Sequence, residues 1–138
     1  MNPCHIHASE RGASTVELLF ALPMLFLIIF GIVETSRAWL TASIVNAAAR
    51  EGARIGVRTP TGSGGAFNPG PALAEIDAIL TQSDLAAGAS RSVTCAAPCE
   101  PGSQVTASVS VPFTSILPVL DAALGTVNIT ETAVMRFE

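Results

Sequence analysis

The chain carries one long apolar run close to its N-terminus, from Leu18 to Val33, with a single acid, Glu17, at its start. A helix needs roughly 20 predominantly apolar residues to cross the hydrocarbon core of a bilayer. Ala13 to Val33 supplies 21 residues if Glu17 is tolerated. The run is followed by Glu34-Thr35-Ser36-Arg37 and not by the small residues of a secretory cleavage site. The sequence therefore predicts a transmembrane helix over 13–34 that stays attached to the chain.

The residues before the run resemble the processing site of type IV prepilins and pseudopilins. In that class a membrane peptidase cuts after a glycine and leaves glutamate as the fifth mature residue. Here Gly12 precedes Ala13, and Glu17 is then the fifth residue. The resemblance implies a cytoplasmic leader over 1–12 that is removed, and pairing of Glu17 with the new amino group of a neighbouring subunit. A carboxylate in hydrocarbon is unfavourable without such a partner. The competing interpretation is that Glu17 only marks the membrane boundary.

The segment that follows the run, 35–58, predicts an extramembrane continuation of the same helix. It contains the sequence NAAAREGAR from Asn46 to Arg54, which is similar to a signature of the TadE-like family. The apolar run resembles the membrane anchor of that family. The motif positions singled out by the resemblance are Asn46, Arg50, Glu51, Gly52 and Arg54.

TadE-like proteins are minor pseudopilins of the tight-adherence pilus machinery. The resemblance implies a single-pass protein of the bacterial inner membrane, with a periplasmic or extracellular C-terminal domain, that acts in pilus assembly, adherence and biofilm formation. Its implied partners are other pilins and pseudopilins, including a related minor pseudopilin, the prepilin peptidase and the pilus assembly platform. The competing hypothesis is an unprocessed, membrane-anchored periplasmic scaffold or binding module. A soluble exported binding domain is disfavoured by the intact membrane run.

Small residues recur at spacings of three and four along the predicted outer helix, and such a stripe lets a second surface approach closely. Two partners for the stripe stay open from the sequence. It packs against the chain's own C-terminal domain, or it packs against neighbouring subunits. The helix-packing positions are Ala38, Ala42, Ala49, Ala53 and Gly56, with Val45 and Gly52 on the same stripe.

Beyond the helix, Gly and Pro residues over 59–70 predict a flexible linker, and 71–138 predicts one small α+β domain. Pro71 suits a first helical turn, and the apolar spacing that follows predicts a helix to about Gln82 or Leu85. Alternation of period two after Gly88 predicts a three- to four-stranded antiparallel sheet with one apolar face covered by helix. Glu131 is the exception on that face. The apolar segment 113–125 predicts either core cover or an interaction patch.

Two of the three cysteines, Cys95 and Cys99, lie close together in the predicted domain, while Cys4 lies in the leader. Thiols pair in oxidising compartments, so a Cys95–Cys99 disulfide is expected if this domain is outside the cytosol. Zinc is disfavoured because the other candidate ligands lie in the leader, across the membrane. Arginines after the membrane run would alone favour the opposite orientation. The prepilin-like site and the cysteine pattern favour an external domain.

Composition argues against several other classes of function. The chain has a formal net charge of -4 and contains no lysine or tyrosine, which does not fit a nucleic-acid binder. Both histidines lie in the leader, so acid–base chemistry in the mature chain would fall on scattered carboxylates. We therefore predict no enzyme activity, no cofactor, no metal and no small-molecule substrate.

Overall fold

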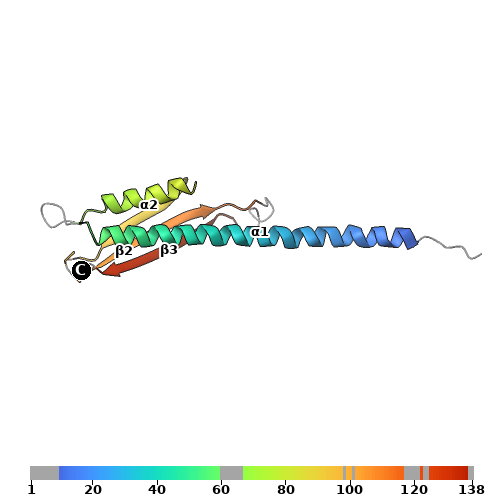
Figure 1. Ribbon diagram of the computed structural model, residues 1–138, viewed down its shortest axis with the longest axis horizontal. Helices are drawn as coiled ribbons and strands as arrows, with labels where there is room; N and C mark the ends of the chain where they lie inside the picture. Colours follow the sequence, from blue (N-terminus) through green and yellow to red (C-terminus); the bar gives the residue numbers. More distant parts are fainter. Residues whose placement is uncertain are drawn as a thin grey trace, which may run out of the picture. The chain divides into compact units, whose positions relative to one another are not determined.

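The computed structural model describes residues 10–59, 67–97, 99–100, 102–116, 122 and 125–136, with side chains from Ser14 onward. The elements run in the order α1 (Glu10–Gly56), α2 (Gly70–Gln82), β1 (Ser90–Cys95), β2 (Gln104–Phe113) and β3 (Val127–Arg136), as Figure 1 shows. They form two compact units, Met1–Ser36 and Arg37–Glu138. The predicted α+β fold, with a long N-terminal helix, a short helix and an antiparallel sheet, is confirmed.

Several predicted features lie outside the described residues, either wholly or in large part. They are most of the leader, the centre of the 59–70 linker, and most of the apolar segment 113–125 beyond Ile116.

The N-terminal unit contains the apolar part of α1. Among the described residues, α1 is the one helix long and apolar enough to cross a membrane, with a mean hydropathy of 2.6 over its most apolar window. Pro23 lies inside the helix. At the end of the apolar run, the Thr35 and Ser36 hydroxyls donate to the carbonyls four residues earlier, both at 2.8 Å. These bonds satisfy hydroxyls without water. A helix of this kind indicates a single-pass membrane protein.

The C-terminal unit is built on an antiparallel sheet with strand order β1–β2–β3. Residues of β2 alternate between buried and partly exposed, as a strand with one covered face requires. The register places Val93 and Ala133 on either side of Ala107, so these three residues share the covered face. On the opposite face, hydroxyl groups pair across strands, for example Ser110 with Thr130 at 2.7 Å.

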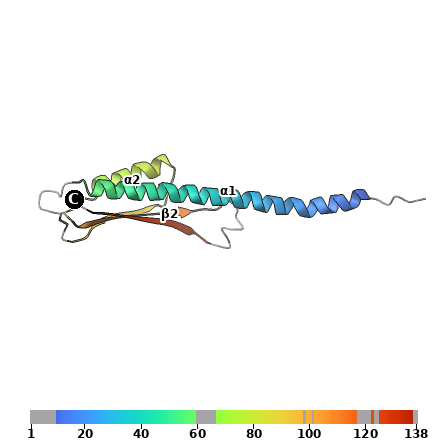
Figure 2. The same ribbon diagram turned by 60° about the horizontal axis from the view of Figure 1, so that its bottom comes forward.

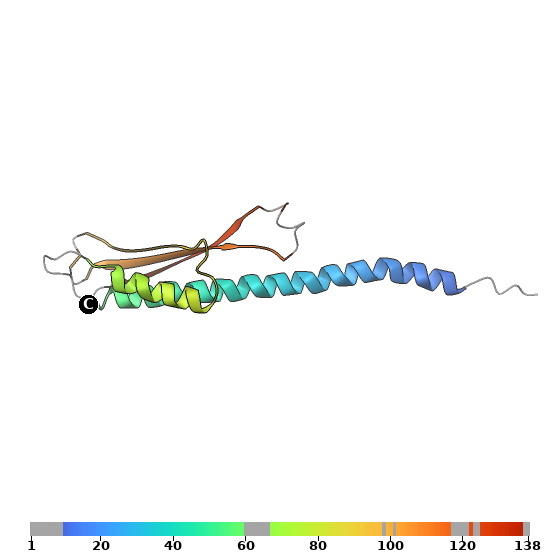
Figure 3. The same ribbon diagram turned by 90° about the horizontal axis from the view of Figure 1, so that it is seen from above.

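Two helical segments cover the apolar face of the sheet. Figures 2 and 3 show α2 alongside the C-terminal part of α1, with the strands on one side of both helices. The core residues come from both helices and from the sheet. The largest fully buried ones are Ile76, Leu80, Val45, Val105, Val109 and Val111. The outer part of α1, predicted as an extramembrane continuation of the helix, thus shares one core with the elements from 70 onward.

The ends of the shorter elements are set by local chemistry. α2 begins at Gly70 with Pro71 in its first turn, as the sequence predicts, because proline lacks the N–H that the first turn leaves unbonded. It ends where Asp84 adopts a φ of 57°, which lets the Leu85 N–H donate to the Leu80 carbonyl at 2.8 Å. Between β1 and β2, Gly102 has a φ of 96°, a conformation open to glycine and strained for other residues.

Candidate functional site

Four of the small residues of the motif segment, Ala48, Ala49, Gly52 and Ala53, lie in the core of the C-terminal unit. Ala48, Ala49 and Ala53 are at most 1% exposed. A Cβ atom on Gly52 would lie 2.5 Å from Cδ1 of Ile76 in α2, so glycine allows the two helices to approach closely. In these turns the small residues pack against the chain's own sheet and second helix.

The two ends of the stripe of small residues on α1 differ in burial. Gly56 is buried, and a Cβ there would lie 2.8 Å from Cγ1 of Val105 in β2. Ala38 and Ala42 are only partly buried. The open surface of the stripe therefore lies at its N-terminal turns.

Asn46, the first residue of the motif, contacts the one acid on the apolar face of the sheet. Its Nδ2 donates to Oε2 of Glu131 at 3.3 Å, across 85 residues of sequence. The β2–β3 register pairs Glu131 with Val109, which is fully buried. A carboxylate among apolar neighbours is stabilised by a hydrogen-bond donor. Glu131, the acid that interrupts the apolar alternation of β3, thus has a hydrogen-bond partner in the motif residue Asn46.

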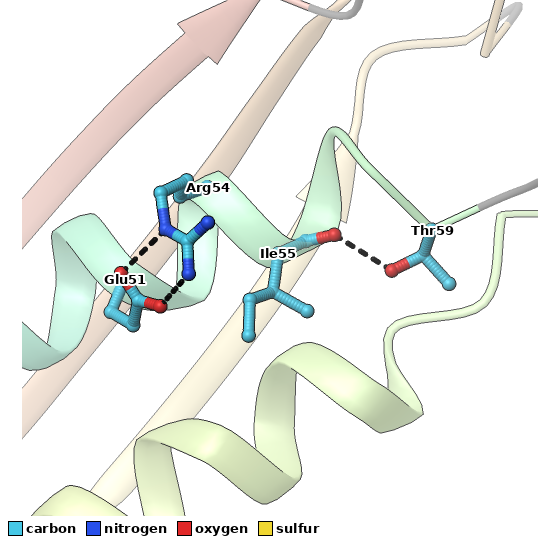
Figure 4. Close-up of polar contacts among 4 residues, drawn as sticks. All are labelled: Glu51, Arg54, Ile55 and Thr59. Carbon is cyan, nitrogen blue, oxygen red and sulfur yellow. Dashed lines mark hydrogen bonds and ion pairs between the residues drawn. The ribbon is translucent and has the colours of Figure 1, made fainter.

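Glu51 and Arg54 form a bidentate ion pair on the partly exposed side of α1, as Figure 4 shows. The Arg54 Nε donates to Glu51 Oε2 at 2.7 Å, and a second bond joins Arg54 Nη2 to Glu51 Oε1. The hydrogen bonds from Arg54 lower the pKa of the Glu51 carboxyl and raise the pKa of the Arg54 guanidinium. Nearby, the Thr59 hydroxyl donates to the Ile55 carbonyl at 2.7 Å and satisfies an acceptor at the helix end.

Arg50, the remaining charged residue of the motif, is exposed and makes no hydrogen bond or ion pair with a described residue. It lies one turn beyond Asn46 on α1, which places both on the same side of the helix.

Two grooves meet at Asn46. One, of about 290 Å³, is lined by Trp39, Ala42, Ser43, Asn46 and Glu131. The other, of about 350 Å³, is lined by Asn46, Ala49, Arg50, Thr132, Ala133, Val134 and Met135.

Two further charged contacts of this unit did not follow from the sequence. Arg91 Nε of β1 lies 2.6 Å from Asp77 Oδ1 of α2 and links the strand to the helix that covers it. The Arg37 guanidinium lies 5.5 Å from the ring centroid of Phe113, within the range of a cation–π contact. Neither contact has a local sequence signal, because each joins residues of different elements.

The processing and registration residues lie in the other unit. The Gly12–Ala13 bond falls within the first turn of α1, and Glu17 is exposed. Around it, fourteen large apolar side chains between Val16 and Val33 are 39–74% exposed. An apolar surface of this extent requires lipid or protein cover.

The predicted Cys95–Cys99 disulfide is confirmed. It closes the connection that follows β1, so it staples one end of the β1–β2 hairpin. No group of three potential metal-ligating side chains occurs among the residues that the structure describes.

A comparison with protein families covers both the membrane run and the motif. Residues 12–54 match the family described as TadE-like protein. This segment is TadE-like. The match confirms the resemblance seen in the NAAAREGAR motif and in the anchor that precedes it. No curated protein and no solved structure shows significant similarity to the chain. The TadE-like family is a family of pilus components rather than of enzymes, and the match suggests a protein associated with the Tad pilus.

Proposed function

We propose that this chain is a minor pseudopilin of a tight-adherence pilus, cleaved by a prepilin peptidase after Gly12 and anchored by the apolar half of α1. The observation that carries the proposal is the TadE-like match over 12–54. It coincides with an exposed apolar helix in which Glu17 follows Gly12 by five residues. The domain that begins with the outer half of α1 then lies outside the cytosol, where its disulfide is stable.

Hydrolysis of the Gly12–Ala13 bond would supply the partner that Glu17 needs. The reaction consumes one water and leaves a carboxylate on the leader and an α-amine on Ala13. That amine is largely protonated near neutral pH, because its ordinary pKa is about 7.7–8.0. A carboxylate at the edge of the hydrocarbon is stabilised by a cation, and the ammonium of an adjacent subunit provides one. The pair fixes one helix against the next during assembly.

N-terminal sequencing of the protein purified from membranes tests the processing step. The expected sequence begins at Ala13. A Gly12→Val variant, which places a branched side chain at the cleaved bond, is expected to keep its leader and to fail in pilus assembly. Retention of the leader by the wild-type protein would instead favour the unprocessed scaffold.

The registration step is tested by neutralising Glu17. Glu17→Gln should be cleaved normally but should reduce piliation by about tenfold or more, the effect of losing about 1.4 kcal/mol of contact. Glu34→Gln, at the other end of the apolar run, is the matched control and should assemble normally. Normal piliation by both Glu17→Gln and the uncleaved Gly12→Val protein would overturn the proposal.

A further inference from the structure

One surface of the C-terminal unit combines a cation and an acid, neither of which makes an ion pair with any residue that the structure describes. It consists of Trp39, Asn46 and Arg50 on α1 with Glu131 on β3, and we call it the α1–β3 face. Both grooves described above open on it and meet at Asn46. β3 is an edge strand of the sheet, and no described element lies beyond it. None of the helices and strands that the structure describes covers the outer edge of β3.

The apolar side chains along this face are poorly covered compared with the neighbouring strand. Val105 and Ala107 in β2 are fully buried, whereas their partners in the register, Met135 and Ala133 in β3, remain partly exposed. Trp39, the chain's single tryptophan, is 79% exposed at one end of the face. An exposed aromatic beside a partly covered groove is typical of an interface.

The charges on the face complement each other but do not pair within one chain. Glu131 accepts one hydrogen bond, from the neutral Asn46 amide at 3.3 Å, and makes no ion pair with a described residue. Arg50 makes no ion pair with the described part of the chain either. A half-buried carboxylate gains most from a charged donor. An arginine offers two such donors in one plane.

We propose that the α1–β3 face binds the same face of a second copy of this chain, with Arg50 of each copy paired with Glu131 of the other. A two-fold interface requires one patch to complement itself, and a patch that carries both an acid and a cation meets that requirement. Four residues separate Asn46 from Arg50, which is about 6 Å along α1. An arginine side chain spans that distance.

The inference rests on the proposed function in one respect. Two copies inserted in one membrane share one orientation, so a two-fold axis that relates them lies along the membrane normal and keeps equal residues at equal heights. The proposed partner is therefore a second copy of the chain in the same membrane. Two symmetric Arg50–Glu131 ion pairs, one on each side of the axis, hold the copies together near the grooves at Asn46.

The interface is tested by charge-reversal variants of the full chain, carried on two differently tagged versions and studied in detergent micelles. Arg50→Glu alone and Glu131→Arg alone should each weaken self-association by about tenfold or more, because each places like charges opposite one another. Mixing the two variants restores both ion pairs in the mixed dimer, so the differently tagged chains should copurify as strongly as wild type. Sedimentation in density-matched detergent gives the affinities.

Arg136→Glu is the matched control, because it reverses a charge on the opposite face of β3 and should leave self-association unchanged. Far-UV circular dichroism checks that each variant is folded. If Glu131→Arg does not fold, Glu131→Gln keeps an acceptor for Asn46 and should weaken association without adding to the effect of Arg50→Glu. A monomeric wild-type chain, or an Arg50→Glu chain that associates normally, would overturn the inference. Because the assay needs neither cleavage nor a pilus, its failure is distinct from failure of the proposed function.

Discussion

Gly52→Ala should destabilise the C-terminal unit, although alanine is the better helix former. At an open helical position the change stabilises by about 1 kcal/mol. Here the new Cβ would lie 2.5 Å from Cδ1 and 2.7 Å from Cγ1 of Ile76. Ile76 is fully buried, so its side chain cannot retreat without displacing its neighbours. Overpacking of a core costs about 1–3 kcal/mol. With two atoms in contact at once we expect a value near the upper end, and a net loss of about 1–2 kcal/mol.

Thermal unfolding of the full chain in detergent micelles, followed by circular dichroism, measures this effect. A loss of this size in a unit of about 100 residues lowers Tm by roughly 5–10 °C. Ile76→Val removes the nearer atom, so the double variant should show a favourable coupling of about 1 kcal/mol. Ala47→Gly is the control, because Ala47 is an exposed position of α1. Its change in Tm measures the difference in helix propensity between alanine and glycine where no core contact is involved. A higher Tm for Gly52→Ala would show that the close approach does not constrain this position, and would refute the reasoning.

Three further outcomes follow from contacts in the same unit. Replacing Cys95 and Cys99 by serine should cost about 2 kcal/mol by the entropy of closing a short loop, measured as a lower urea midpoint that reductant reproduces in wild type. Asp77→Asn should cost at most about 1 kcal/mol, and the difference should shrink with added salt, because its bond to Arg91 is partly exposed. Glu51→Gln should be less stable than wild type at neutral pH. The difference should vanish as pH falls through the lowered pKa of Glu51, because a depressed folded-state pKa stabilises only above it.

The regular elements of the fold were predictable because their signals are local. The alternation of valine with hydroxyl residues in β2 requires one buried and one open face, and the structure shows that pattern. Pro71 fixed the start of α2 to within one residue. The disulfide was predicted from the short spacing of Cys95 and Cys99 together with the expectation that the domain lies outside the cytosol. The strand and helix inferences used only residues within a few positions of one another.

The contacts of the motif were not predictable in the same way. Sequence marked Glu131 as an exception on an apolar face, but its partner, Asn46, lies 85 residues earlier. Gly52 looked like one small residue among several, and its requirement for glycine comes from Ile76 on another helix. A stripe of small residues indicates close packing without saying what packs there. The fold supplies that partner, and in the turns from Val45 to Gly56 it is the chain itself.

This burial changes where an assembly surface can lie. Ala48, Ala49, Gly52 and Ala53 of the NAAAREGAR motif are buried, so their substitution would disturb the fold before it disturbed contacts with another subunit. The Glu51–Arg54 pair satisfies its own charges within one helix. Arg50 is the motif residue whose charge has no described partner, and Asn46 is the one that opens onto both grooves. Core and surface positions of the motif can therefore be separated by experiment. Core substitutions should lower Tm at every protein concentration, whereas Arg50→Glu should lower Tm only at concentrations at which the wild-type chain self-associates.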